Sequence, residues 1–276
     1  GKATPPAGLI QDAPTTSVGS NRTLSWFGSA AYDFRGKYRA TVSLRRDASS
    51  LFAPENRTGY FPSGAVAWHI GEENFMQGAR SWLDDLKLRA SIGAVGNNRI
   101  PSDEWKSTFI TSGNYGYAFT ESITPGMYIT KLTNRSLVWE TTLSRNLAVD
   151  FSVFRGRLSG SLEVYQNSTK DLLLSANIPQ TSGYSVQTQN IGETENKGLE
   201  IQLQGVVAEG NDFNWTTNFN MAFNKNTILN LGIDTDGNPL KSYLTESGWI
   251  HSTYQDFQVE VGKPVGQFYG YVTDGF

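Results

Sequence analysis

Residues 212–224 read DFNWTTNFNMAFN, and apolar and polar side chains alternate along almost the whole stretch. Because successive side chains of a β-strand point to opposite faces, this alternation predicts a strand with one apolar and one polar face. The apolar face would carry Phe213, Trp215, Thr217, Phe219, Met221 and Phe223, and the polar face Asn214, Thr216, Asn218, Asn220, Ala222 and Asn224. Strands of transmembrane β-barrels alternate in this way, since one face meets lipid and the other a water-filled interior.

Seven further stretches repeat the alternation and predict seven more strands. They are residues 22–34, 37–45, 60–70, 86–95, 145–154, 157–166 and 197–206. The stretch 60–70 is the weakest, and Phe27 departs from the pattern in the first. Several stretches approach the roughly 9–11 residues that a tilted strand needs to cross a bilayer. We therefore expect an all-β fold, an antiparallel transmembrane β-barrel.

The connections between these strands alternate between short and long. The short ones are 35–36, 155–156 and 207–211, and the long ones are 46–59, 96–137, 172–195 and the stretch after residue 224. Bacterial barrels have short periplasmic turns and long extracellular loops. Loops of this length are uncommon in soluble domains, so the alternation supports a barrel and predicts its orientation.

One connection, residues 71–85, is of intermediate length and has helical spacing. Phe75, Met76, Ala79, Trp82 and Leu83 would form one stripe of a short helix. We expect a periplasmic helix tucked under the barrel wall. The alternative is a short core helix of a soluble α+β domain.

The composition agrees with a β-protein and excludes several other classes. Charged residues make up only 18% of the 276 residues and aromatic residues 12%, and there are 28 glycines. The net charge of -3 gives no argument for a nucleic-acid partner, and without cysteine there is neither a disulfide nor a cysteine metal site. No apolar run is long enough for a transmembrane helix. No signal peptide opens the chain, so we expect the natural N-terminus to lie upstream.

Charged side chains on the predicted inward faces indicate a wide barrel. They include Arg39, Arg45, Lys87, Arg89, Asp150 and Glu163. A small barrel fills its interior with side chains and would have to pair these charges, whereas a wide barrel leaves them in water. We therefore expect a fragment of a larger barrel, or a barrel with an interior plug.

An ordered set of short motifs resembles one family of barrel proteins. The motifs include RRDASSLF at 45–52, AWHIGEENFM at 67–76, LKLRASIGAVGN at 86–97, WETT at 139–142, NKGLE at 196–200 and GQFYGYVTDGF at 266–276. Together they resemble the SusC/RagA type of TonB-dependent outer-membrane transporter over about residues 22–276, although Ala48 replaces the usual glycine. The resemblance implies a barrel of about 22 strands. Residues 1–276 would be part of one barrel domain, and the family's N-terminal plug and TonB-contacting region would not be present.

The same resemblance implies a function in the bacterial outer membrane. Members of this type import glycans, oligosaccharides or peptides with a SusD-type surface lipoprotein as a lid, and TonB supplies the energy. The expected partners are therefore that lipoprotein, TonB through the missing N-terminal region, outer-membrane lipid and the glycan or peptide. A nucleic acid is not expected. The alternative reading is a soluble carbohydrate-binding or glycosidase β-domain, in which the apolar faces would form one dry core.

No catalytic residue, metal site or cofactor is predicted. The two histidines, His69 and His251, have no spacing that supports a catalytic triad. The acid pairs 72–73 and 84–85 lie beside the expected helix, and the pair 72–73 is at its N-terminus, where the helix dipole favours acids, so glycosidase chemistry is not expected. Residues 234–238 begin like an EF-hand loop, but Pro239 and Thr245 stand where that loop needs glycine and glutamate, so a polar turn is expected.

Ligand-binding candidates lie in the long loop and on the inward faces. The loop 96–137 carries aromatic side chains suited to sugar rings and peptide side chains: Trp105, Phe109, Tyr115, Tyr117, Phe119 and Tyr128. The alternative is that they pack the loop or contact the lid. Arg39, Arg45, Arg89 and Glu163 would face the lumen and line the translocation path, or form an ordinary solvated interior.

Overall fold

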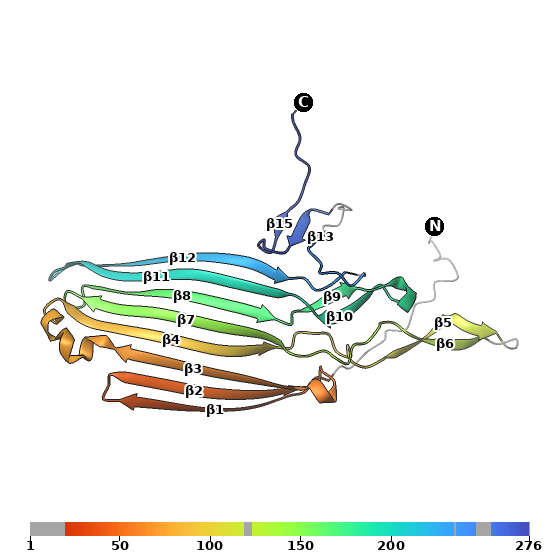
Figure 1. The fold of residues 1–276 in the computed structure, drawn as a ribbon, viewed down its shortest axis with the longest axis horizontal. Coiled ribbons are helices and arrows are strands. Elements are labelled where there is room, and N and C mark those ends of the chain that lie inside the picture. Colours follow the sequence, from red (N-terminus) through yellow and green to blue (C-terminus); the bar gives the residue numbers. More distant parts are fainter. Residues whose placement is uncertain (1–19, 119–122, 235, 247–254, 276) are drawn as a thin grey trace, which may run out of the picture.

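A computed structural model describes residues 20–118, 123–234, 236–246 and 255–275, and its main feature is one antiparallel eight-stranded sheet (Figure 1). The strands are β1 Thr23–Phe34, β2 Tyr38–Ser49, β3 Thr58–His69, β4 Leu83–Asn97, β7 Glu140–Val153, β8 Leu158–Lys170, β11 Glu193–Glu209 and β12 Asn214–Asn230. They lie in this order across the sheet, so each strand pairs with its predecessor and successor among the eight. This sheet, called the wall, confirms the eight predicted strands and the all-β antiparallel fold.

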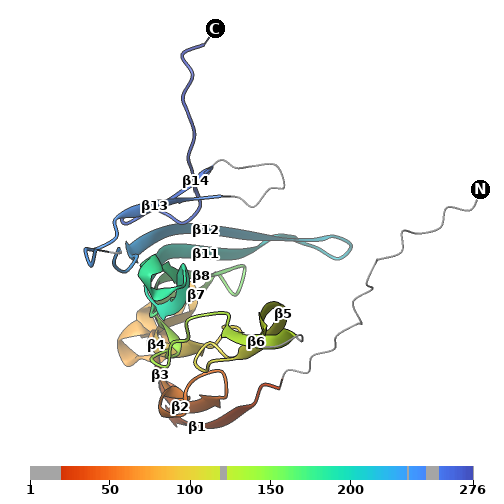
Figure 2. The same ribbon diagram turned by 90° about the vertical axis from the view of Figure 1, so that its right-hand side faces the viewer.

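The wall is curved, and it does not close on itself. Figure 2 shows it nearly end-on, with β1 and β12 at its two ends. Within the described part of the chain, β1 and β12 each pair on one side only. Because unpaired strand edges are not tolerated inside a bilayer, the wall needs further strands on both sides. No helix in the ranges described is long and apolar enough to cross a membrane.

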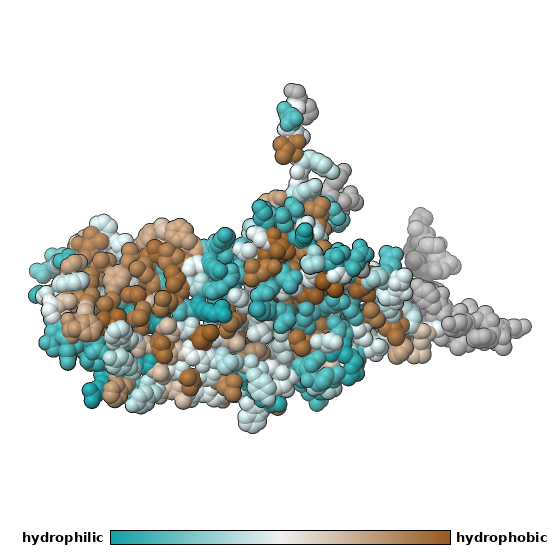
Figure 3. Space-filling model, in the orientation of Figure 1, coloured by the Kyte–Doolittle hydropathy of each residue, from teal (hydrophilic) through white to brown (hydrophobic). Residues whose placement is uncertain are grey.

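The two faces of the wall differ as the alternation predicts. The apolar side chains are exposed on one face, for example Trp26 at 65%, Leu44 at 51% and Phe219 at 44%. Figure 3 shows this apolar surface over the half of the wall that carries the short turns. The polar side chains line hollows on the opposite, concave face. A soluble domain with one dry core would have buried the apolar set, so the alternative fold is not what forms.

Most strands extend further than predicted at the end with the long loops. β2 runs to Ser49 and β3 begins at Thr58, so the predicted long loop 46–59 is wrong and only residues 50–57 connect them. In the same way β12 continues to Asn230. Beyond the apolar band both faces of a strand can be polar, so the alternation that reveals a strand disappears although the backbone pairing continues.

The long loops carry small elements of their own, which the sequence pattern did not reveal. The strands are β5 Phe109–Ala118, β6 Ile123–Ile129, β9 Leu173–Asn177, β10 Val186–Asn190, β13 Ser242–Thr245, β14 Phe257–Glu260 and β15 Gln267–Phe268, and the 3₁₀ helices at this end are η1 Pro54–Asn56 and η4 Gln180–Ser182. β5 pairs with β6 and β9 with β10, while β13, β14 and β15 form a third small sheet. The hairpin of β5 and β6 projects beyond the wall at the loop end (Figure 1).

The predicted helix at 71–85 is wrong in type and in packing. The connection holds two 3₁₀ helices, η2 Ile70–Glu72 and η3 Asn74–Ala79, with no buried residue. Phe75 is 68% exposed and meets the Trp68 ring edge-on at a centroid distance of 6.5 Å. Leu83, the last residue of the stripe, is buried at the start of β4, but Phe75 does not tuck under the wall. The Phe75 ring extends a series of outward-facing rings in which Tyr38 and Trp68 stack at 6.4 Å, as in the aromatic girdle of a barrel.

An apolar cluster at the opposite end joins the long loops to the strands. This loop-end core consists of Phe52, Phe61, Ile100, Leu137 and Trp139, each at most 8% exposed. Trp139 packs on Phe52 and Phe61 at ring-centroid distances of 5.4 and 5.6 Å. β3 and β4 pair only as far as Ser63 and Gly93, and the Phe61 ring fills the space beyond, against Gly59 and Gly96. The loops are therefore packed onto the wall.

Candidate functional site

The concave face carries the candidate site, because its side chains are polar and lie in open hollows. One hollow of about 280 Å³ is lined by Arg39, Arg89 and Glu163 among others, and a neighbouring one of about 620 Å³ is lined by Arg45 and Asp47. All four charged candidates therefore lie on the predicted face. Among these four residues only Arg89 and Glu163 contact each other, with Arg89 Nη2 3.8 Å from Glu163 Oε2.

Asp150 is the centre of the charge cluster around Arg89. The Arg89 guanidinium donates to Asp150 through Nε at 2.7 Å and through Nη2 at 2.8 Å, a bidentate pair. Lys87 Nζ lies 3.7 Å from Asp150 Oδ2. The alternation already set Asp150 inward on β7, but only the pairing of β4 with β7 shows that it faces Arg89 and Lys87.

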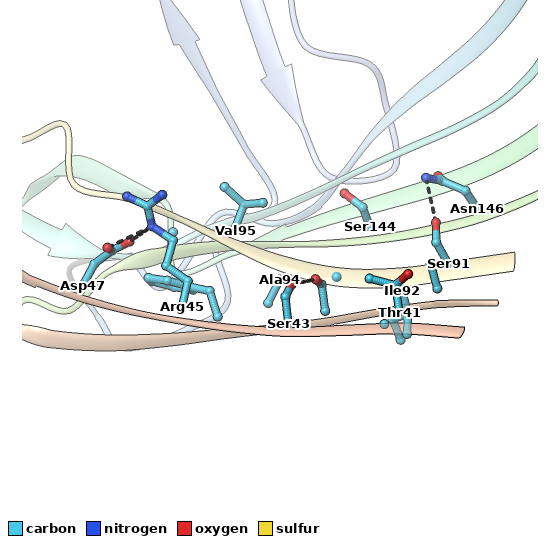
Figure 4. A pocket seen from close by; sticks show the side chains of 16 residues that line it. Thr41, Ser43, Arg45, Asp47, Ser91, Ile92, Ala94, Val95, Ser144 and Asn146 are labelled. Carbon is cyan, nitrogen blue, oxygen red and sulfur yellow. Dashed lines mark hydrogen bonds and ion pairs between the residues drawn. The ribbon is translucent and has the colours of Figure 1, made fainter. Parts of the chain in front are cut away.

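Arg45 has its own partner nearer the loop end. Figure 4 shows its side chain in the larger hollow, beside Asp47 on the same strand. Arg45 Nε donates to Asp47 Oδ2 at 2.7 Å, and Arg45 Nη2 donates to Ser25 Oγ at 3.3 Å. The sequence interpretation missed Asp47 because it ended the strand at residue 45. Continuing the alternation by two residues would have found it.

Amide side chains dominate the rest of the concave face. Tyr165 Oη donates to Asn224 Oδ1 at 3.0 Å, across Gly198 on the strand between them. Asn226 donates to Asn196 at 3.0 Å. Asn218, Asn220 and Asn224 line hollows here, as expected from their alternation. Such a surface offers many neutral donors and acceptors, which suit hydroxyl and amide groups of a passing solute.

Trp105, the first aromatic loop candidate, is tied into the loop packing. Its ring lies under the guanidinium groups of Arg57 at 5.6 Å and Arg135 at 5.8 Å, and its Nε1 donates to the Ser50 carbonyl at 3.3 Å. The ring therefore holds loop 98–139 onto loop 50–57. This contact agrees with the packing alternative and leaves its role in ligand binding a prediction.

The other aromatic candidates belong to the projecting hairpin. Tyr115 and Tyr117 lie on β5, Phe109 is 60% exposed at the start of that strand, and Tyr128 on β6 is 40% exposed. Phe119 lies outside the described residues. The exposed side chains of Phe109 and Tyr128 are therefore accessible on this hairpin to a ligand or a partner protein.

Several acidic residues weighed for catalysis or metal binding have structural partners. Asp84 accepts from the Gly156 backbone N–H at 2.8 Å, and Asp234 Oδ1 accepts from the backbone N–H of Asp236 at 2.9 Å, which makes the expected polar turn. His69 ends β3, and His251 lies outside the described residues. Among the residues described, no three potential ligands cluster as a metal site.

Glu73 clamps the turn between β3 and β4 to the first hairpin. Its carboxylate accepts from Tyr38 Oη at 2.6 Å, Lys37 Nζ at 2.9 Å and Trp68 Nε1 at 3.2 Å. These hydrogen bonds, the one from Tyr38 foremost, favour the charged form and lower the pKa of Glu73 to about 2.

This low pKa makes the short-turn end sensitive to acid. Because the pKa rises to its ordinary value of 4.5 on unfolding, Glu73 stabilises the fold above that pH, and the contribution is lost as the pH falls from 4.5 towards 2. We expect the free energy of unfolding of the wild type to exceed that of Glu73→Gln at pH 7, and the difference to vanish near pH 2. Unfolding titrations across this pH range would measure it. Glu72→Gln is the control, since Glu72 is exposed and, within the described ranges, pairs only with Arg80 at 3.3 Å. A difference that stays constant with pH would contradict the clamp.

Comparison with known proteins agrees with this geometry. The family described as "TonB dependent receptor-like, beta-barrel" matches residues 2–275. TonB-dependent receptor P3 of Formosa agariphila is 35% identical over 97% of this chain and 26% of its own length. TonB-dependent receptor SusC of Bacteroides thetaiotaomicron is 34% identical over 89% of this chain and 26% of its own length. The chain thus spans about a quarter of these curated relatives.

Solved structures give the same fold. The RagAB peptide importer in its open-open state superposes with a TM-score of 0.77 and 26% identity, covering 93% of this chain and 27% of that one. Its closed-closed state gives a TM-score of 0.75 at 27% identity, over 89% of this chain and 25% of that one.

Proposed function

From the premise that this chain belongs to the TonB-dependent receptor β-barrel family of the bacterial outer membrane, we propose that it forms part of the wall of a SusC/RagA-type importer of glycans or peptides. The single observation that carries the proposal is the contrast between the two faces of the wall. An exposed apolar convex face suits lipid, and a polar concave face with open hollows suits a hydrated path. We propose transport and no enzymatic activity, in keeping with relatives that carry receptor names.

The path would be lined by the concave side chains. We propose that Arg39, Arg45, Arg89 and Glu163 face the passing solute, with Asp150 and Asp47 holding two of the arginines in place. The aromatic side chains of the long loop, Trp105, Tyr115, Tyr117 and Tyr128, would meet it first at the mouth. Stacking on such rings serves sugars and peptide side chains equally, so this geometry supports either cargo.

The partners would act at opposite ends of the barrel. A SusD-type lipoprotein would cover the loop end, where the hairpin of β5 and β6 projects (Figure 1). TonB would act through the N-terminal region that the resemblance places outside this chain. The name RagAB, which belongs to a solved peptide importer, supports a two-component arrangement.

Uptake in cells tests this proposal directly. We expect deletion of the gene for the full-length protein to reduce entry of its labelled oligosaccharide or peptide cargo to background, because solutes of that size do not pass through porins. Loss of TonB should have the same effect. Libraries of labelled oligosaccharides and of labelled peptides, measured separately, would distinguish the two cargo classes. Unchanged uptake of both libraries after deletion, or uptake that survives loss of TonB, would contradict the proposal.

A further inference from the structure

The apolar band on the outer face ends abruptly along one line that crosses four neighbouring strands. On β7, β8, β11 and β12 the outward side chains nearest the short turns are mostly apolar, and then Arg145, Gln166, Lys197 and Lys225 follow. These four residues oppose one another in strand register, Arg145 with Gln166, Gln166 with Lys197 and Lys197 with Lys225. Figure 3 shows the matching change from an apolar to a hydrophilic surface.

The line lies where the membrane surface should be. On β12 the outward residues run from Trp215 to Lys225, ten residues apart, or about 33 Å along a strand. A strand tilted by about 40° rises about 25 Å over that length, which is the height of the apolar band of a barrel. Trp215 follows a short turn, so Lys225 lies at the rim nearer the long loops, the extracellular side.

The three cations of this line, the basic row, are not fully neutralised by the protein. Lys197 Nζ lies 2.8 Å from Glu195 Oε1, and the charge of Arg145 also acts on that carboxylate at longer range. In the described part of the chain, neither Arg145 nor Lys225 has an acidic partner within 4.0 Å. Farther out, Lys170 and Glu193 pair with each other at 3.5 Å. The row therefore keeps an excess of positive charge.

The arrangement has an energetic cost that a bound anion would remove. Lys197 and Lys225 lie directly opposite each other in the β11–β12 pair, and like charges in this position destabilise a sheet. Gln166 lies on the other side of Lys197 and donates to Glu195. An anionic group outside the wall, near Lys197 and Lys225, would remove this repulsion, and Arg145 two strands away would add to the positive potential that attracts it.

We propose that the basic row binds the phosphorylated headgroup of a lipid in the outer leaflet of the outer membrane. The acyl chains would lie along the apolar face below the row, against side chains such as Leu199 and Phe223, and the phosphate would meet the cations at its edge. This inference needs the chain's place in the outer membrane, and it is independent of the cargo that the barrel carries.

Lipid retention by the full-length protein tests the proposal. Near an anionic membrane surface each basic side chain is worth a factor of about five in binding, so the triple change Arg145→Gln, Lys197→Gln, Lys225→Gln should weaken binding of diphosphorylated lipid A about 100-fold. Native mass spectrometry of protein purified in detergent would count the bound lipid. The matched control removes three cations from the short-turn end, Arg35→Asn, Arg80→Asn and Arg155→Asn, and should retain the lipid.

Measurements on the wild type keep the test decisive if the triple variant fails to assemble. Diphosphorylated lipid A should bind far better than chemically dephosphorylated lipid A, and rising salt should release it. Equal binding of the two lipids would show that only the acyl chains are recognised, which overturns the proposal. Displacement of the lipid by inorganic phosphate at equal concentration would show a free-anion site instead. Full retention by a folded triple variant would also overturn it.

Discussion

Replacing Phe52 with alanine is expected to destabilise the loop end of the barrel by about 3–5 kcal/mol, the usual cost of removing a large buried aromatic side chain. Phe52 is fully buried and packs on Trp139 at a ring-centroid distance of 5.4 Å. The substitution leaves a cavity in the cluster that joins loop 50–57 to loop 98–139. We expect the free energy of unfolding to fall, measured by denaturant titration of the full-length protein in lipid vesicles. Protease cleavage within loop 98–139 should become faster.

The matched control for this change is Phe109→Ala. Phe109 belongs to the same long loop but is 60% exposed, so its removal should change the free energy of unfolding by less than about 0.5 kcal/mol. If Phe52→Ala and Phe109→Ala had equal effects, the loop-end core would not be what fixes the loops to the wall.

Replacing Met221 with arginine is expected to destabilise the barrel by about 2–4 kcal/mol, because an arginine near the bilayer midplane must leave water. Met221 lies on the apolar face of β12, opposite Ile201, and about midway between Trp215 and Lys225. Unfolding in lipid vesicles would measure the loss, and the fraction of heat-modifiable, folded protein on a gel should fall with it.

Asn220→Arg supplies the control on the next residue of the same strand. Asn220 lines a hollow on the concave face together with Gln202 and Asn218, so an arginine there stays in water and should be nearly neutral. A large loss from Asn220→Arg with little effect from Met221→Arg would reverse the two faces and contradict the barrel orientation of the wall.

Much of the fold could be predicted because the alternation of side chains is a local property. Each of the eight strands was identified from period two alone, and the two faces followed with them. The prediction failed where the alternation of side chains gives no signal. β2 continues to Ser49 beyond the apolar band. Of the stripe at 75–83, Phe75, Met76 and Ala79 lie on a 3₁₀ helix without buried residues and Leu83 begins β4, because spacing alone does not say whether a surface is covered.

The candidate site was predicted only as a set of inward-facing residues. Arg89 and Asp150 are 61 residues apart in sequence, and the bidentate pair between them exists because β4 and β7 are neighbours across a long loop. The structure also adds contacts that the sequence did not reveal around Trp105. The guanidinium groups of Arg57 and Arg135 lie against its ring, and its role in ligand binding stays a prediction.

The sequence by itself determined the strands, their two faces and, through its motifs, the resemblance to the SusC/RagA type, because these depend on neighbours in the chain. The tertiary structure alone decided which side chains meet across strands. A β-bulge between Val206 and Ala208 illustrates the reason. Pairing on the β12 side starts with Glu209 opposite Asn214. Without the bulge, the same register would continue and set Lys197 opposite Asn226, on the concave face. The bulge shifts the register by one residue, and Lys197 meets Lys225 on the outer face instead.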